Sequence, residues 1–245
     1  MNLDGTERRI SALESFPQGG VAVIFGATGG IGSALTEVLR THGRLNSVLR
    51  FSRTTSPAID LLDEASVEHA AAFAAASGEV RLVIDATGFL HDERQVPEKS
   101  WRDLDAAKLA RSFALNAIGP ALLMKHVLPM LPRKGKAVFA TLSARVGSIA
   151  DNRLGGWYAY RASKAALNQL VRTSAIELAR RSPEALCIAL HPGTVATPLS
   201  APFATAGLQV HQPIEAAHHL LAVVDRLAAG SSGGFFDWRG QPVPW

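Results

Sequence analysis

The sequence predicts an α/β fold, a doubly wound parallel sheet within a single domain. Two observations indicate it: short continuous apolar runs that end at turn residues, and helical segments that separate them over 245 residues. Such alternation favours parallel strands with helices on both faces of the sheet. The length allows one or two domains, and no repeat, linker or change in composition divides the chain. We therefore expect one domain.

The expected strands are apolar runs, and the first is Val21–Phe25, which stops at Gly26 as a strand buried on both faces should. The remaining expected strands are 47–52, 80–85, 136–142, 186–191 and the short 234–236. The expected helices are 30–41, 63–77, 105–131, 158–181 and 213–229. The third helix should be distorted near Pro120, because proline has no N–H to donate within a helix.

Two segments fall outside this alternation. Residues 1–19 precede the first strand and are expected to be a loosely held N-terminal arm, which leaves 20–245 as the folded domain. Residues 196–212 contain prolines and little periodicity. We expect them to form a substrate loop over the strand ends, where long functional loops occur.

Composition and charge exclude several classes of function. Hydrophobic residues make up 47% of the chain and charged residues 19%, which is typical of a globular protein. The net charge of +4 comes from 25 basic and 21 acidic residues. The basic residues are scattered rather than gathered into the long stripe that follows a phosphate backbone. We therefore expect no nucleic-acid partner.

The chain shows no sign of a membrane span, a signal peptide or a metal site. Its longest uncharged stretches, 185–214 and 15–36, are interrupted by prolines or glycines, and the first twenty residues contain charges but no apolar run. Cys187 is the single cysteine, and the histidines lack ligand spacing. We expect a cytoplasmic protein with no membrane partner and no metal.

The first expected strand ends in a glycine-rich turn that leads directly into a helix. The turn reads Gly26-Ala27-Thr28-Gly29-Gly30-Ile31-Gly32. Glycines allow a tight turn, and they let backbone N–H groups approach a pyrophosphate at the helix N-terminus, whose dipole favours an anion. We therefore assign a dinucleotide phosphate site to the four glycines, Thr28 and Ile31. The spacing fits both G-x-x-x-G-x-G and G-x-x-G-x-x-G.

The residue that contacts the adenosine ribose is expected at the end of the second strand, about twenty residues after the glycines. Counting from Gly32 reaches Ser52, which is followed by Arg53. A carboxylate at this place would bind the ribose hydroxyls of NAD, and none is present. The Arg53 guanidinium can pair with a 2′-phosphate instead. The sequence therefore favours NADP(H) over NAD(H), with Ser52 and Arg53 at the site.

Tyr160 and Lys164 form a Y-x-x-x-K pattern in the expected helix 158–181. Positions i and i+4 share one helix face, about 6 Å apart along the axis. The pattern alone is common, but here it follows the fourth strand of a chain whose first strand ends in a glycine turn. This combination resembles the classical short-chain dehydrogenase/reductase family, and the resemblance extends from residue 20 over nearly the whole chain. It implies that residues 20–245 form an NAD(P)-binding Rossmann domain.

The resemblance implies that hydride passes between a nicotinamide and a carbonyl or secondary-alcohol substrate. Tyr160 would be the acid/base, because the developing alkoxide needs a proton. A free tyrosine has a pKa of ~10, and the Lys164 ammonium with the positive nicotinamide would lower it towards neutral pH. Lys164 would also hold the nicotinamide ribose. Asn116 matches the helix asparagine that positions a proton-relay water in the family.

The resemblance also covers cofactor contacts outside the glycine turn. Asp60, with Leu61, matches the aspartate that contacts the adenine. The end of the third strand carries Asp-Ala-Thr-Gly where the family has Asn-Asn-Ala-Gly, so that only the small residues Ala86 and Gly88 correspond. The segment 191–199 resembles the Pro-Gly loop that meets the nicotinamide amide. The contacts implied at this loop are Pro192, Gly193, Val195 and Thr197.

The serine that binds the substrate oxygen in the family has two candidate positions. Counting back three residues from Gly147 places it at Ala144, and Ser143 matches the neighbouring serine. The insert 150–157 before Tyr160 makes the separation longer than is common, and it can shift the register. We assign the role to Ser143, with Ala144 as the alternative.

Two classes of function follow, together with one assembly. The first is an NADP(H)-dependent carbonyl reductase or alcohol dehydrogenase acting on a small molecule. The second is a cofactor-binding signalling or sensor protein with little turnover, which Ala144 and a similarity of segments 143–149, 157–164 and 234–245 to the C-factor-like subgroup support. An extended-type epimerase is disfavoured by the length.

The family often pairs its long helices, here Ser112–Met130 and Tyr158–Arg180, so a homodimer or homotetramer is expected.

Overall fold

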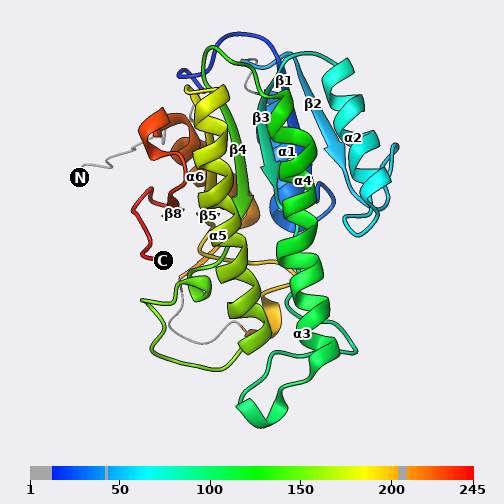
Figure 1. Ribbon diagram of the computed structural model, residues 1–245, viewed down its shortest axis with the longest axis vertical. Helices are drawn as coiled ribbons and strands as arrows, with labels where there is room; N and C mark the ends of the chain where they lie inside the picture. The colour runs from blue at the N-terminus through cyan, green and yellow to red at the C-terminus, as the bar shows by residue number, and fades with distance from the viewer. Residues whose placement is uncertain (1–12, 42–43, 204–208) are drawn as a thin grey trace, which may run out of the picture.

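The computed structural model in Figure 1 describes residues 13–41, 44–203 and 209–245, and its centre is a parallel sheet of six strands. The strands are β1 (Val21–Phe25), β2 (Ser47–Phe51), β3 (Val80–Asp85), β4 (Ala137–Leu142), β5 (Ala185–His191) and β8 (Phe235–Asp237). Their order is β2-β1-β3-β4-β5-β8. The chain therefore changes direction across the sheet between β1 and β3, and in open parallel sheets ligands bind at such a switch point.

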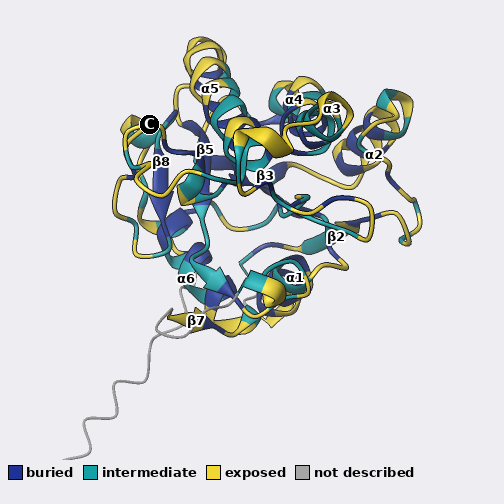
Figure 2. Ribbon diagram, turned by 90° about the horizontal axis from the view of Figure 1, so that it is seen from below, coloured by how far each residue is buried: buried dark blue, intermediate teal, exposed yellow. Residues whose placement is uncertain are grey.

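Helices cover both faces of the sheet, as Figure 2 shows. One face carries α1 (Gly30–Thr41) and α6 (Pro213–Arg226), which pack against each other. The helices on the other face are α2 (Glu64–Ala76), α3 (Ala106–Phe113), α4 (Gly119–Val127) and α5 (Tyr158–Arg181). Short 3₁₀ turns lie at Trp101–Asp103, Leu128–Met130, Arg145–Gly147, Ala201–Phe203 and Ala229–Ser231. The predicted fold class is confirmed.

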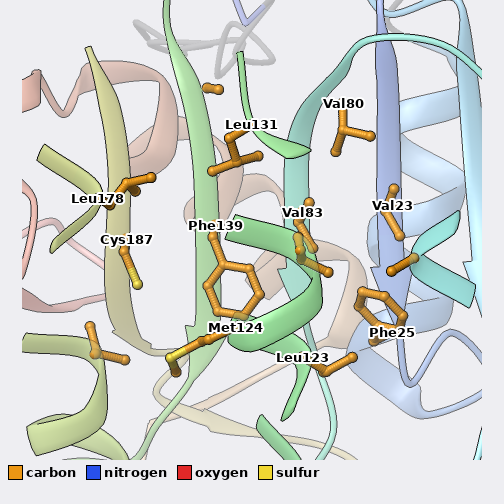
Figure 3. Packing of buried hydrophobic residues seen from close by; sticks show 14 of the residues in the cluster. Val23, Phe25, Val80, Val83, Leu123, Met124, Leu131, Phe139, Leu178 and Cys187 are labelled. Atoms are coloured by element: carbon orange, nitrogen blue, oxygen red, sulfur yellow. The ribbon is translucent and has the colours of Figure 1, made fainter. Parts of the chain in front are cut away.

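Side chains alternate along each strand into two hydrophobic cores. In β1, Val23 and Phe25 face the α2–α5 side, whereas Ile24 faces α1 and α6. Figure 3 shows the first core, in which Phe139 of β4 and Cys187 of β5 lie beside one another. Burial raises the pKa of the Cys187 thiol to about 12, so this cysteine is an inert core residue.

The predicted third helix is one continuous run with a distortion inside it. A π-helical turn at Ala114–Ile118 joins α3 to α4 directly before Gly119 and Pro120. Pro120 has no N–H to donate to the carbonyl of Asn116. The helical hydrogen bonds therefore change locally from the α-helical to the wider π-helical pattern. The run Ala106–Met130 is long and apolar enough to match a membrane span by length and composition alone, and its helices contact α2 and α5.

The expectation of a loosely held arm is wrong for residues 13–19. Leu13 and Phe16 are buried against the α1–α6 core, and Arg44 donates from Nε to the Phe16 carbonyl over 2.9 Å. Packing here removes two large apolar side chains from water, which stabilises the segment. Residues 1–12 lie outside the described part of the chain.

The predicted substrate loop includes a short element that its sequence does not reveal. Strands β6 (Thr194–Val195) and β7 (Val210–His211) form a parallel pair at its base. Residues 204–208 lie outside the described residues. Two-residue strands carry no periodicity, so pattern reasoning cannot find them.

Candidate active site

A cavity of about 500 Å³ opens at the carboxyl ends of β4 and β5. Its wall combines the start of α5, the segment after β4 and the loop after β5. Its lining includes Ser143, Ala144, Trp157, Tyr160, His191 and Thr197. Several residues that were predicted to carry chemistry therefore meet around one space.

The glycine turn is built so closely that side chains are excluded from it. Gly26 has φ +75°, a conformation that favours glycine, and a Cβ there would lie 2.9 Å from the Ala86 carbonyl carbon. A Cβ on Gly32 would lie 2.2 Å from the Gly26 oxygen, and one on Gly30 would lie 2.7 Å from the Thr197 methyl group. The turn thus leaves a bare backbone at the N-terminus of the twelve-residue helix α1, which fits a dinucleotide phosphate.

The end of β2 lies directly beside this turn, because the N–H groups of Gly26 and Ala27 both donate to the Phe51 carbonyl, over 2.9 and 3.1 Å. Ser52 is buried, and its hydroxyl accepts from the Thr54 N–H over 3.2 Å. Arg53 is exposed, and it forms no ion pair with any residue that the structure describes. A guanidinium without a protein carboxylate is available to a phosphate at this place.

The other predicted adenine and ribose contacts have varied surroundings. Asp60 accepts the Leu62 N–H over 2.9 Å in a local turn, and Leu61 packs against Gly119. Ala86 continues β3 by donating its N–H to the Phe25 carbonyl over 2.9 Å. Gly88 lies against α5: a Cβ there would be 3.7 Å from Lys164 Nζ.

Tyr160 lies in the first turn of α5, and Lys164 lies one turn later on the same face. Lys164 Nζ donates to the Leu142 carbonyl over 2.8 Å and lies 5.9 Å from the centre of the Tyr160 ring. Burial raises the pKa of Tyr160 to about 12, so the lowering towards neutral pH that was expected from the Lys164 ammonium is wrong for this structure. Burial also lowers the pKa of Lys164 to about 8, against the opposing charge of Asp85. The phenol is therefore protonated at neutral pH and can act as an acid.

Asp85 is a buried carboxyl group at the position where the sequence departs from the family pattern. It accepts hydrogen bonds from the Thr87 N–H over 3.0 Å, from the Thr87 hydroxyl over 2.5 Å and from the Thr141 hydroxyl over 2.7 Å. Burial raises its pKa above the usual range, although these hydrogen bonds and the Lys164 charge oppose the shift. Asp85 thus places a carboxyl group near Lys164 where the family pattern has an asparagine.

Asn116 is fully buried within the π-helical turn. Its amide pairs with both backbone groups of Phe89: Nδ2 donates to the carbonyl over 2.7 Å, and Oδ1 accepts the N–H over 2.8 Å. Nδ2 also donates to the Ser163 hydroxyl over 3.1 Å. The side chain therefore ties the segment after β3 to α5, and the proton-relay role remains a prediction.

Ser143 and Ala144 both line the cavity, but the Ser143 hydroxyl is already engaged. It donates to Asn168 Oδ1 over 2.7 Å, and the serine is only 4% exposed. A hydroxyl has one proton, so this one is directed to α5 rather than to a substrate oxygen. Ala144 carries no hydroxyl at the position that counting from Gly147 favours.

The loop after β5 places the expected nicotinamide contacts beside the glycine turn. Gly193 has φ +80°, and a Cβ there would lie 3.0 Å from both the His211 and Trp238 rings. The Thr197 methyl group leaves no room for a side chain at Gly30, and the Thr197 N–H donates to the Ser200 hydroxyl over 3.2 Å. The loop contacts that line the cavity are Pro192, Gly193, Val195 and Thr197.

Two residues of the site were missed in the sequence. His191 lines the cavity directly before Pro192. Glu98 is buried, and it fixes the start of α5: its carbonyl accepts the Trp157 N–H over 2.6 Å, and its Oε2 accepts the Ala159 N–H over 3.2 Å. For His191 the available signal was its place at a strand end, whereas nothing local marks Glu98.

Trp157 forms part of the cavity wall in a strained conformation. It has φ +53°, which is uncommon for a residue with a side chain, and its ring packs 5.0 Å from Phe203 and 6.2 Å from Tyr160. Arg161 holds the adjoining loops by donating to the carbonyls of Val146 and Gly156 over 3.2 and 3.0 Å. Hydrogen bonds and ring contacts thus order this wall.

The described residues include no cluster of three metal-ligating side chains.

Known proteins resemble this chain over most of its length. The profile of a family described as enoyl-(acyl carrier protein) reductase matches residues 26–229. The Myxococcus xanthus protein C-signal is 41% identical over 143 residues, covering 58% of this chain and 82% of the relative. The 1-hydroxy-2-glutathionyl-2-methyl-3-butene dehydrogenase of Rhodococcus sp. strain AD45 is 32% identical over 192 residues, covering 78% and 80%. An NADPH-bound carbonyl reductase from chicken fatty liver shares the fold, with a TM-score of 0.80, 24% identity and coverage of 93% and 100%.

Proposed function

The chain belongs to the short-chain dehydrogenase/reductase family, and we propose that it is an NADP(H)-dependent oxidoreductase that interconverts a carbonyl compound and a secondary alcohol. The observation that carries this proposal is the placement of Tyr160, one helical turn before Lys164, in one cavity with the loop that follows β5. A glycine turn fit for a dinucleotide phosphate adjoins the same loop at Thr197. The three parts together suit hydride transfer coupled to proton transfer.

The residues of this chain bind, orient and move a proton. The nicotinamide, when bound, supplies or accepts the hydride. In the reducing direction the Tyr160 phenol donates its proton to the developing alkoxide, and the raised pKa of Tyr160 keeps that proton available at neutral pH. Lys164 Nζ is held by its hydrogen bond to the Leu142 carbonyl, and its ammonium would hold the nicotinamide ribose. Val195 and Thr197, which line the cavity, would orient the nicotinamide amide.

The preference for NADP(H) rests on Arg53. This guanidinium is exposed at the end of β2, and no carboxylate stands at Ser52 or Arg53 to bind the ribose hydroxyls of NAD. A 2′-phosphate would provide the negative partner that Arg53 lacks among the described residues. The NADPH in the chicken carbonyl reductase is consistent with this choice.

The assembly that we propose is a homodimer or homotetramer that pairs α4 and α5, in a cytoplasmic protein without nucleic-acid or membrane partners. An apolar groove between these helices contains Met124, Leu128, Leu170 and Leu178. Exposed Ile118, directly before α4, and Ile176 of α5 add to the apolar surface of this region. Size-exclusion chromatography with light scattering tests this, and a monomer at micromolar concentration would contradict it.

The proposed activity is tested by titrating the protein with NADPH and then following NADPH oxidation at its absorbance band with a panel of ketones and aldehydes. We expect binding and turnover of at least one carbonyl, with turnover abolished by Tyr160→Phe. Binding of NADPH without turnover on the whole panel, or turnover that Tyr160→Phe does not change, would contradict the proposed enzymatic mechanism.

Binding without turnover would favour the second candidate, a cofactor-binding sensor with little turnover. The observation that supports this candidate is Ala144, which leaves no hydroxyl where counting from Gly147 places the family serine. A sensor would bind NADPH and change its partner binding with the redox state of the nicotinamide. Pull-down from the source cells with either form of the cofactor would then distinguish the two states.

A further inference from the structure

Carbonyl reduction needs a second hydrogen-bond donor besides Tyr160, because negative charge develops on the oxygen before the proton arrives. Donors aimed at such an oxygen are among the largest contributions to catalysis. In this chain Ala144 has no hydroxyl, and the proton of Ser143 goes to Asn168. Neither of the two positions that the sequence offered for the serine donor therefore supplies one to the cavity.

His191 lies beside these two positions at the carboxyl end of the sheet and lines the same cavity. It is the last residue of β5, and the register pairs Leu142 with Leu190, so Ser143 and His191 are the next residues of the two neighbouring strands. The Ser143 N–H donates to the Leu190 carbonyl over 2.8 Å, which holds the two strand ends together. His191, Ala144 and Tyr160 line the same cavity.

The imidazole of His191 has hydrogen-bonding capacity that the protein does not use. Nδ1 is buried, and it has no hydrogen-bond partner among the described residues. Because Nδ1 is enclosed, it cannot reach a molecule in the cavity, so a hydrogen bond from His191 to a cavity ligand has to come from Nε2–H, with Nδ1 as the unprotonated nitrogen. Burial lowers the pKa of His191 to about 4, assisted by Arg145 and opposed by Asp237. A neutral imidazole carries one N–H donor and one acceptor.

We propose that His191 donates an N–H hydrogen bond to the substrate carbonyl oxygen and replaces the hydroxyl that position 144 lacks. The proposal rests on the proposed carbonyl-reductase function. Hydride from the nicotinamide forms the new C–H bond, the Tyr160 proton forms the O–H bond, and His191 stabilises the oxygen without losing its proton. The imidazole thereby acts as a neutral electrophile beside the phenol.

The test is a double-mutant cycle between His191→Ala and Ala144→Ser, measured as kcat with a saturating carbonyl. We expect His191→Ala to lower kcat about 10²-fold, as the removal of an oxyanion donor does, while the Kd for NADPH changes less than about twofold. Ala144→Ser should restore kcat of the His191→Ala protein at least about tenfold, because it returns the serine hydroxyl. His69→Ala, which replaces an exposed histidine on α2, is the matched control and should leave kcat unchanged.

Several outcomes would overturn the proposal. An unsubstituted protein that turns over a carbonyl, with His191→Ala within twofold of it, would remove His191 from the reaction and leave the proposed function intact. An equal loss of kcat from His191→Ala with and without Ala144→Ser would show that the imidazole acts only in packing. If His191→Ala fails to fold, His191→Leu keeps much of the side-chain volume without a donor and should show the same loss. No turnover by the unsubstituted protein would remove both proposals.

Discussion

Replacing Asn116 by alanine tests whether its amide joins the segment after β3 to the catalytic helix. The substitution leaves two backbone groups of Phe89 without their partner, the N–H at 2.8 Å and the carbonyl at 2.7 Å. A buried polar group left unsatisfied costs about 1–3 kcal/mol, so two of them predict a loss of about 2–6 kcal/mol. Ser163 keeps its second hydrogen bond, to the Tyr160 carbonyl, and adds little.

The loss is measured by urea denaturation followed through tryptophan fluorescence. The matched control is Asn46→Ala, because Asn46 is exposed and its side chain forms no hydrogen bond within the described residues. We expect the control to change the free energy of unfolding by less than about 0.5 kcal/mol. A loss below about 1 kcal/mol for Asn116→Ala would show that Phe89 finds other partners and would refute the structural role. A large loss of kcat with unchanged stability would instead support the proton relay.

Three further predictions follow from single contacts. Arg53→Asp should raise the Kd for NADPH more than that for NADH, since it removes the partner of the 2′-phosphate; equal changes would remove the NADP(H) preference. Glu98→Ala should destabilise the protein by about 1 kcal/mol and lower kcat by loosening the start of α5, whereas Glu98→Gln keeps the acceptor for Ala159; equal effects on thermal unfolding would contradict this role. The rate of reduction should fall as the pH rises through about 8, because Lys164, with its pKa lowered to about 8, loses its charge there, while Tyr160 stays protonated to about pH 12. A pH–rate profile that is flat across this range would exclude the Lys164 titration.

The fold could be predicted from local pattern because its strands are uninterrupted apolar runs. Val21–Phe25 is buried at every position. In the turn after it, glycine is required because a Cβ would collide with neighbouring atoms. Tyr160 and Lys164 were predictable because a fixed spacing on a helix fixes their relative positions. Local information was therefore sufficient for the sheet and for two residues of the site.

The remaining site depends on contacts between distant segments, which no local pattern records. Glu98 fixes α5 from a loop 61 residues before Ala159 in the chain. The hydroxyl of Ser143 is directed by Asn168 on that helix, and the sequence could not show which partner it takes. The burial of Phe16 could not be predicted, because it depends on Arg44 and α6, which only the folded chain brings next to it. Its segment was therefore expected to be a loose arm.

The central claim is that Tyr160 supplies the proton for hydride transfer in this cavity. Its most direct test is the single-turnover rate of NADPH oxidation with an accepted carbonyl, compared between the unsubstituted protein and Tyr160→Phe. The account predicts a rate lowered by about 10²–10⁴-fold, with the Kd for NADPH unchanged, because only the phenol hydroxyl is lost. A Tyr160→Phe protein that oxidises NADPH at an undiminished rate would contradict it.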